Sequence, residues 1–106
     1  MNTTGSTNFD NIFTNCFSLT SIPQLDTSSV TNFNSMFNTC TSLTEIPQLD
    51  TSSGTNFTYM FRNCSSLASI SQLDTSKGTS FNSIFYGCTA DVDGLDFSNA
   101  TGSSSV

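Results

Sequence analysis

Cysteine is the residue type in this chain with the widest range of chemistry, and it recurs at a single interval. The four cysteines are each 24 residues from the next: Cys16, Cys40, Cys64 and Cys88. Zinc sites are commonly built on short C-x-x-C pairs, and this spacing supplies none. Stacked copies could come within disulfide range, but side chains that leave parallel segments in the same direction do not face one another. We therefore expect buried, reduced cysteines that pack as small apolar side chains.

Aspartate forms a second series with the same interval, Asp26, Asp50 and Asp74. Stacked carboxylates repel one another, and a bound cation would relieve that repulsion. The interpretation that we favour is structural: each carboxylate caps its own turn by accepting hydrogen bonds from backbone N–H groups.

Two short motifs have the composition of a functional site without its full pattern. The stretch DVDGLD resembles a fragment of a calcium loop but lacks the complete spacing and the bidentate glutamate. It supplies three weak calcium candidates: Asp91, Asp93 and Asp96. A polar capping turn is the favoured interpretation there. Triplets of the form N-x-[ST] arise by chance in a chain this rich in Asn, Ser and Thr. They begin at Asn2, Asn56, Asn63 and Asn99.

The residue types that the chain lacks argue against catalysis. It has no histidine, so neither a Ser–His nor a Cys–His pair can form. Its two cationic residues are Arg62 and Lys77, so a lysine nucleophile would have to be Lys77. No glycine-rich phosphate loop is present. We predict a protein that is not an enzyme and uses no cofactor.

Three outward positions depart from the Ser/Thr/Asn background and are the candidate ligand-binding residues. Tyr59 and Arg62 are three residues apart, and Tyr86 stands 24 residues after Arg62. Tyrosine and arginine are enriched in binding hot spots. The alternative is that an isolated surface cluster of this kind has no function.

The charge of the chain limits its partners. Only 9% of its residues are charged, and its formal net charge is −6. Nucleic acids and anionic membrane surfaces require clusters of Lys and Arg, so both are disfavoured. No apolar run approaches the roughly 18 residues of a membrane span, and the opening MNTTGSTNFD lacks the charged and apolar regions of a signal peptide. The expected partners are a host or cell-surface protein or glycan, or further copies of the chain.

An internal repeat must position all of these residues. When the sequence is shifted by 24 residues, its apolar positions align without gaps as far as Cys88. Repetition at a fixed period is typical of a solenoid, in which each unit buries its apolar face against its neighbours. We expect one solenoid domain over residues 1–106. Its repeats are about 3–26, 27–50, 51–74 and 75–98, with an irregular C-terminal cap and tail at 89–106. The predicted structural core is Phe33, Met36, Phe37, Cys40, Leu43, Ile46 and Leu49.

Each 24-residue unit is predicted to divide into two halves. In TNFNSMFNTC, residues 31–40, apolar residues follow the i, i+3, i+4, i+7 spacing of a helix face, so a short helical turn is expected. The following SLTEIPQLD, residues 42–50, is expected to be a short strand, with Pro47 where regular pairing stops. One strand per unit would stack into a parallel sheet, which makes the expected fold an α/β solenoid.

The repeat resembles the BspA-like leucine-rich repeats of bacterial surface proteins. MFNTC at 36–40 matches their MF-x-x-C motif, and LDTS at 49–52 matches the start of their LDTS-x-V-T-N motif. The valine of the second motif is present as Val30, but Gly54 and Gly78 replace it at the equivalent positions of the next two repeats. The resemblance implies a right-handed, leucine-rich-repeat-like solenoid. It also implies an extracellular, cell-surface or virion-surface location, because adhesins, surface lipoproteins and tailed-phage proteins carry similar repeats. It implies no single ligand, since fold does not determine function.

Two functions are consistent with these observations. The first is a surface module for adhesion or recognition of a host protein or glycan. The second is a structural subunit that stacks end to end into an extracellular filament or phage appendage, because solenoid ends that match each other can polymerise. We favour the recognition module.

Overall fold

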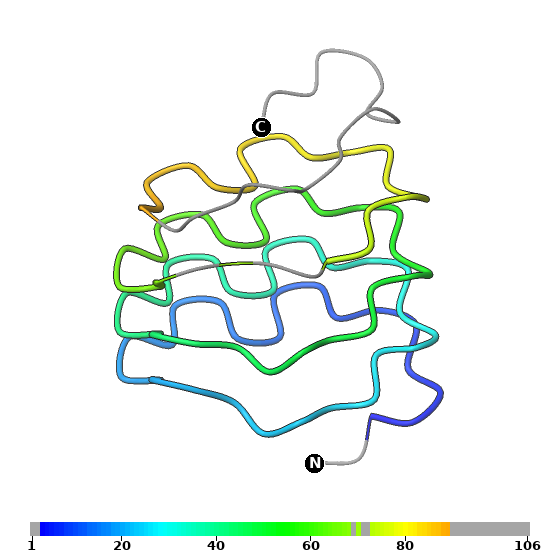
Figure 1. The fold of residues 1–106 in the computed structure, drawn as a ribbon, viewed down its shortest axis with the longest axis horizontal. Helices are drawn as coiled ribbons and strands as arrows, with labels where there is room; N and C mark the ends of the chain where they lie inside the picture. The colour runs from blue at the N-terminus through cyan, green and yellow to red at the C-terminus, as the bar shows by residue number, and fades with distance from the viewer. Residues whose placement is uncertain (1–2, 69, 71–72, 90–106) are drawn as a thin grey trace.

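The computed structural model describes residues 3–68, 70 and 73–89 of the chain. In these residues the 24-residue segments lie one above another, as the blue, cyan, green and yellow parts of the trace show in Figure 1. We call these segments coils 1 to 4 and give them the repeat boundaries stated above. Parallel bridges join equivalent positions of successive coils: Asn8 to Asn32, Asn32 to Asn56, and Asn56 to Ser80. The coils are therefore stacked in a constant register.

Hydrogen bonds between coils use every second residue of the segment that follows each bridge. In coil 2 the N–H groups of Phe33 and Phe37 donate to the carbonyls of Asn56 and Met60 in coil 3, both at 2.8 Å. The intervening N–H groups donate within their own coil, as from Met36 to the carbonyl of Phe33 at 3.2 Å. Coils 1 and 3 repeat the alternation. This segment is therefore a run of turns and a parallel ladder at once.

The helical turn predicted for residues 31–40 is replaced by consecutive turns. No helix is present in the described residues, and hence none with the length and hydropathy of a membrane span. Positive φ angles recur every fourth residue in the turn segments, at Asn11, Asn15, Ser35, Thr39, Tyr59, Asn63, Ser83 and Gly87. A right-handed helix requires negative φ throughout, and it would draw N–H groups away from the neighbouring coil. Four-residue turns bring i, i+3, i+4 and i+7 to one side as a helix does, which explains the misleading spacing.

β pairing in the described residues is limited to the three bridges, which precede the turns. The strand predicted for residues 42–50 is absent. Irregular chain takes its place, with few hydrogen bonds between coils, such as that from the N–H of Thr44 to the carbonyl of Thr20 at 3.0 Å. Pro47 and its equivalent Pro23 have no N–H to donate, which prevents a regular ladder in this half of the coil.

The core is built from equivalent positions of successive coils. In coil 2 the core residues with no exposed surface are Val30, Phe33, Met36, Phe37, Cys40 and Leu43. Leu49 is also buried, whereas Ile46 is only partly buried and packs against the others. Because each coil buries the same positions against the next, the interior is continuous through the stack.

Phenylalanine rings form two stacks through the coils. In the first, the rings of Phe33, Phe57 and Phe81 are nearly parallel, with successive centroids 5.4 Å apart. In the second, Phe37 and Phe61 are also 5.4 Å apart. Aromatic pairs at such distances contribute about 0.5–1.5 kcal/mol each beyond the burial of their surface.

Glycine at position 54 leaves room for the first ring stack. A Cβ atom there would lie 2.5 Å from the ring of Phe57 and 2.9 Å from that of Phe33. Val30 occupies the equivalent position in coil 2 and is wholly buried, and there the rings of Phe9 and Phe33 are edge-on, 6.4 Å apart at 75°. The exchange of valine for glycine between coils thus accompanies a change from edge-on to parallel rings.

Candidate functional site

The predicted binding residues Tyr59, Arg62 and Tyr86 lie together on the surface, and we call them the tyrosine–arginine cluster. The Cζ atom of Arg62 is 5.5 Å from the ring centroid of Tyr59 and 5.7 Å from that of Tyr86. Both distances are within the range of about 6 Å over which a cation is attracted to an aromatic face. Tyr59 is 37% exposed and Tyr86 63% exposed, so the cluster is open to solvent.

The turns of coils 3 and 4 position these side chains. Tyr59 has a φ of 58°, and its N–H donates to the carbonyl of Asn82 in coil 4 at 3.1 Å. The N–H of Arg62 donates to the carbonyl of Tyr59 at 3.2 Å, which closes a turn in coil 3. Tyr86 has the same place in coil 4 as Arg62 has in coil 3, and the constant register brings the two side chains together. The cluster therefore depends on backbone hydrogen bonds within and between coils.

Gly87 and Asn63 shape the backbone beside the cluster, a role that the sequence pattern did not predict for either residue. Gly87 has a φ of 76°, and a Cβ atom there would overlap the Oδ1 atom of Asn63. The N–H of Asn63 donates to the carbonyl of Tyr86 at 2.6 Å, so the two coils approach closely at this point. The available signal was a glycine at a position where the other coils have Asn15, Thr39 and Asn63.

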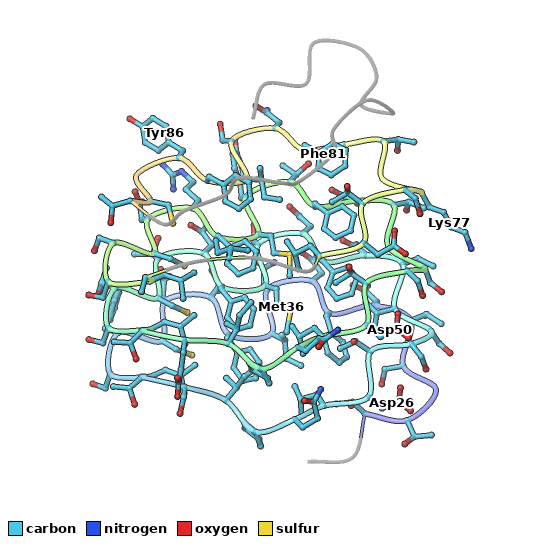
Figure 2. The ribbon with its side chains drawn as sticks, in the orientation of Figure 1. Asp26, Met36, Asp50, Lys77, Phe81 and Tyr86 are labelled. Atoms are coloured by element: carbon cyan, nitrogen blue, oxygen red, sulfur yellow. The ribbon has the colours of Figure 1, made fainter. Side chains whose placement is uncertain are left out.

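Arg62 has no acidic partner in the part of the chain that the structure describes. There its guanidinium contacts the two tyrosine rings and forms neither an ion pair nor a hydrogen bond. Figure 2 places Tyr86 at the opposite edge of the molecule from Asp26, Asp50 and Lys77. The positive charge of the cluster is therefore separated from the aspartate series.

The aspartate series caps turns, as predicted. The Oδ1 atom of Asp50 accepts hydrogen bonds from the N–H of Ser52 at 3.0 Å and from its hydroxyl at 2.6 Å. Asp26 and Asp74 have the same contacts with the serine two residues further on. These hydrogen bonds, from the serine side chain first and from its backbone second, lower the pKa of all three carboxyl groups.

A groove of about 580 Å³ follows the aspartate series, and Gln24 and Gln48 are among its lining residues. No group of three His, Cys, Asp or Glu side chains within the described ranges is arranged to hold a metal ion. The weak calcium candidates Asp91, Asp93 and Asp96 lie outside the described residues, as does most of the predicted C-terminal cap. The three aspartates that line the groove are engaged in the capping contacts described above.

The cysteines are present as thiols. Cys40 and Cys64 are wholly buried, and their Sγ atoms donate to the carbonyls of Phe13 at 3.0 Å and Phe37 at 3.1 Å in the preceding coil. Burial raises the pKa of Cys40 to about 11 and that of Cys64 to about 12, so both are protonated at neutral pH. The prediction of buried, reduced side chains is confirmed for these two.

Comparison with protein families now adds to the geometry. A family model described as "Mycoplasma protein of unknown function, DUF285" matches residues 1–105. The chain belongs to the DUF285 family. Membership of DUF285 agrees with the resemblance to BspA-like repeats at the level of the family, not of the 24-residue variant. Comparison with curated proteins and with solved structures gives no match.

Proposed function

We propose that this chain is a non-enzymatic recognition module, exposed on a cell or virion surface, that binds a host protein or glycan through the tyrosine–arginine cluster. We also propose that its stack of coils is a single leucine-rich-repeat-like solenoid of the 24-residue BspA-like variant. The observation that carries the functional proposal is the guanidinium of Arg62, which lies against two exposed tyrosine rings and has no partner among the described residues.

The chemistry of the cluster favours binding over a structural role. Large rings with few rotatable bonds bury much surface with little entropy loss, and a guanidinium offers five N–H donors. The contacts of Tyr59 and Tyr86 with Arg62 restrict the arginine before a ligand arrives, which reduces the entropy lost on binding. No carboxylate or carbonyl of the described residues uses the donors of the Arg62 guanidinium, so they remain available to a ligand.

The test is binding of the labelled protein to host cells and to arrays of cell-surface glycans and proteins. The double variant Tyr59→Ser/Tyr86→Ser should reduce binding about tenfold or more, because it removes both rings of the cluster. Phe17→Ser is the matched control, since Phe17 is an aromatic residue of coil 1 that is 58% exposed and lies outside the cluster. Equal binding by the wild type and the double variant would refute the proposal.

End-to-end stacking is the second candidate, and one observation favours it. The face of coil 1 that points away from coil 2 has Ile12, Phe13, Cys16 and Leu19 only partly buried, although their equivalents in coil 2 are wholly buried. The carbonyls of Asn8, Asp10, Ile12 and Thr14 receive no backbone N–H from the described residues, whereas the equivalent carbonyls of coil 2 all do. A coil stacked on this face would satisfy both, and a second copy of the chain is the proposed source of that coil.

Size-exclusion chromatography with light scattering over a concentration series distinguishes the two candidates. A monomer at every concentration would exclude stacking between copies. Open-ended oligomers that grow with concentration would make assembly the primary function. Replacement of Phe13 by Ser should then suppress growth, because it removes an apolar contact at the exposed end.

A further inference from the structure

We infer that the tyrosine–arginine cluster binds a sugar that carries a carboxylate, such as a uronic acid within a glycan. This inference rests on the proposed recognition function and assigns its ligand. Three features of the described residues lead to it: the unpaired charge of Arg62, the two rings that hold it, and the polar character of the surrounding surface.

The charge of Arg62 is available to a ligand. The chain has eight acidic residues and two cationic ones, so a neighbouring carboxylate would have been the expected partner. Instead the aspartate series is engaged with its own serines at the opposite edge of the molecule (Figure 2). An anion at the cluster therefore competes with no carboxylate in the described part of the chain.

The geometry of the guanidinium favours a planar anion. Its N–H donors lie in one plane as a rigid fork, which matches the two oxygens of a carboxylate. The rings of Tyr59 and Tyr86 hold Arg62 by its positive charge and leave those donors unused. A carboxylate can accept two parallel hydrogen bonds from the fork while the tyrosine hydroxyls offer further contacts.

The surrounding surface favours a sugar over an acidic protein. Stable protein interfaces bury about 1,200–2,000 Å² in total around an apolar centre. Large exposed apolar side chains in the described residues are limited to Phe17, Tyr59 and Tyr86, and Phe17 belongs to coil 1. Two rings provide flat surfaces for one or two sugar rings, and the neighbouring Asn, Ser and Thr side chains can both donate to and accept from sugar hydroxyls.

Tyrosine fluorescence provides a direct measurement of this site. The chain has no tryptophan and only two tyrosines, both in the cluster, so emission excited at a wavelength that tyrosine absorbs and phenylalanine does not comes from the proposed site alone. The probe is an oligosaccharide that contains glucuronic acid, titrated to about 1 mM, which detects weak single-site binding. Its control is the same oligosaccharide with each carboxyl reduced to a hydroxymethyl group.

The expected result is a saturable change in emission with the acidic sugar and an affinity at least about tenfold lower for the reduced one. Arg62→Gln should lower affinity for the acidic sugar by a similar factor, whereas Lys77→Gln, which removes the other positive charge, should not. Arg62→Lys should weaken binding several-fold, because it keeps the charge and loses the fork. Circular dichroism on each variant verifies that the fold is retained.

Each other outcome contradicts a defined part of the argument. Equal affinity for the acidic and the reduced sugar would overturn the carboxylate and leave the recognition function intact. Saturable binding of a short glutamate-containing peptide, with none of the sugar, would overturn the sugar and keep the carboxylate. No change in emission with either probe would overturn the inference, and the cell-binding comparison of the tyrosine double variant then decides separately whether the recognition function stands.

Discussion

Gly87 is the residue that allows coils 3 and 4 to approach closely beside the cluster. It combines a φ of 76° with close approach to the side chain of Asn63, so a larger residue meets two obstacles at once. The backbone of Tyr86 is linked to Asn63 at the same place. The left-handed backbone of Gly87 and the hydrogen bond from Asn63 to Tyr86 thus lie next to each other beside the cluster.

Gly87→Ala should lower the free energy of unfolding by about 2–4 kcal/mol, because it adds a left-handed backbone penalty to overlap with Asn63. The matched control is Gly5→Ala. Gly5 has a φ of 81° and nothing within 4 Å of a Cβ atom, so only the backbone penalty of about 1–2 kcal/mol applies. Chemical denaturation measures both. Equal losses would show that the contact with Asn63 is relieved without loss of stability.

At the scale of the elements, buried threonines join the start of each of the first three coils to the end of the same coil. Thr51 is 1% exposed, and its Oγ1 atom donates to the carbonyl of Asp74 at 3.0 Å and accepts from the N–H of Asp74 at 2.8 Å. Thr3 and Thr27 donate in the same way to the carbonyls of Asp26 and Asp50. These side chains supply hydrogen bonds where the backbone ladder is absent.

Thr51→Val should reduce the free energy of unfolding by about 1–3 kcal/mol, since the methyl group keeps the volume and leaves the backbone groups of Asp74 without their partner. Thr55→Val is the matched control. Thr55 is exposed, and its hydroxyl donates to the carbonyl of Thr31 at 3.2 Å, so water can replace the lost contact and the change should stay within about 0.5 kcal/mol. Thermal unfolding compares the two; similar losses would mean that burial at Thr51 is unimportant.

The elements also show how far the sequence could predict this structure. The 24-residue repeat identified the buried positions and placed Tyr86 beside Arg62, because register depends only on the period. The backbone conformation between these positions could not be inferred, since four-residue turns and a helix both bury residues at positions i, i+3, i+4 and i+7. Positive φ at Ser35 and Tyr59 has no clear sequence signal. Gly87 did have a sequence signal, because it is a glycine where the other coils have Asn or Thr. The structural reason for that glycine is clear only when the neighbouring Asn63 is seen beside it.

For the whole molecule, the aspartate series predicts how stability depends on pH. The carboxyl groups of Asp26, Asp50 and Asp74 have a pKa below the ordinary value of 3.8, through hydrogen bonds from serine hydroxyls and backbone. A carboxyl group whose pKa is lower in the folded than in the unfolded state stabilises the folded protein at pH values above its unfolded pKa. This stabilisation is lost as the pH falls through the folded-state pKa. Stability should therefore be constant with respect to these groups at neutral pH and decline below about pH 4.

Thermal unfolding between pH 2 and pH 7 tests this, with a triple variant in which Ser28, Ser52 and Ser76 are replaced by Ala. The variant loses the hydroxyl contacts that contribute most to the lowered pKa values. Its melting temperature should depend less on pH in the acid range than that of the wild type. An identical acid transition in both proteins would assign the effect to other groups.

The constant register of the coils has a genetic consequence. Insertion or deletion of one whole coil, as replication slippage between similar repeats produces, joins equivalent positions again and preserves the alternating ladder. The tyrosine–arginine cluster is not preserved in the same way, because Arg62 belongs to coil 3 and Tyr86 to coil 4. Loss of coil 3 would place Asn38 of coil 2 beside Tyr86. A single slippage event can therefore remove a binding specificity while the fold remains. Duplication of a coil can likewise place a different residue beside Arg62 or Tyr86.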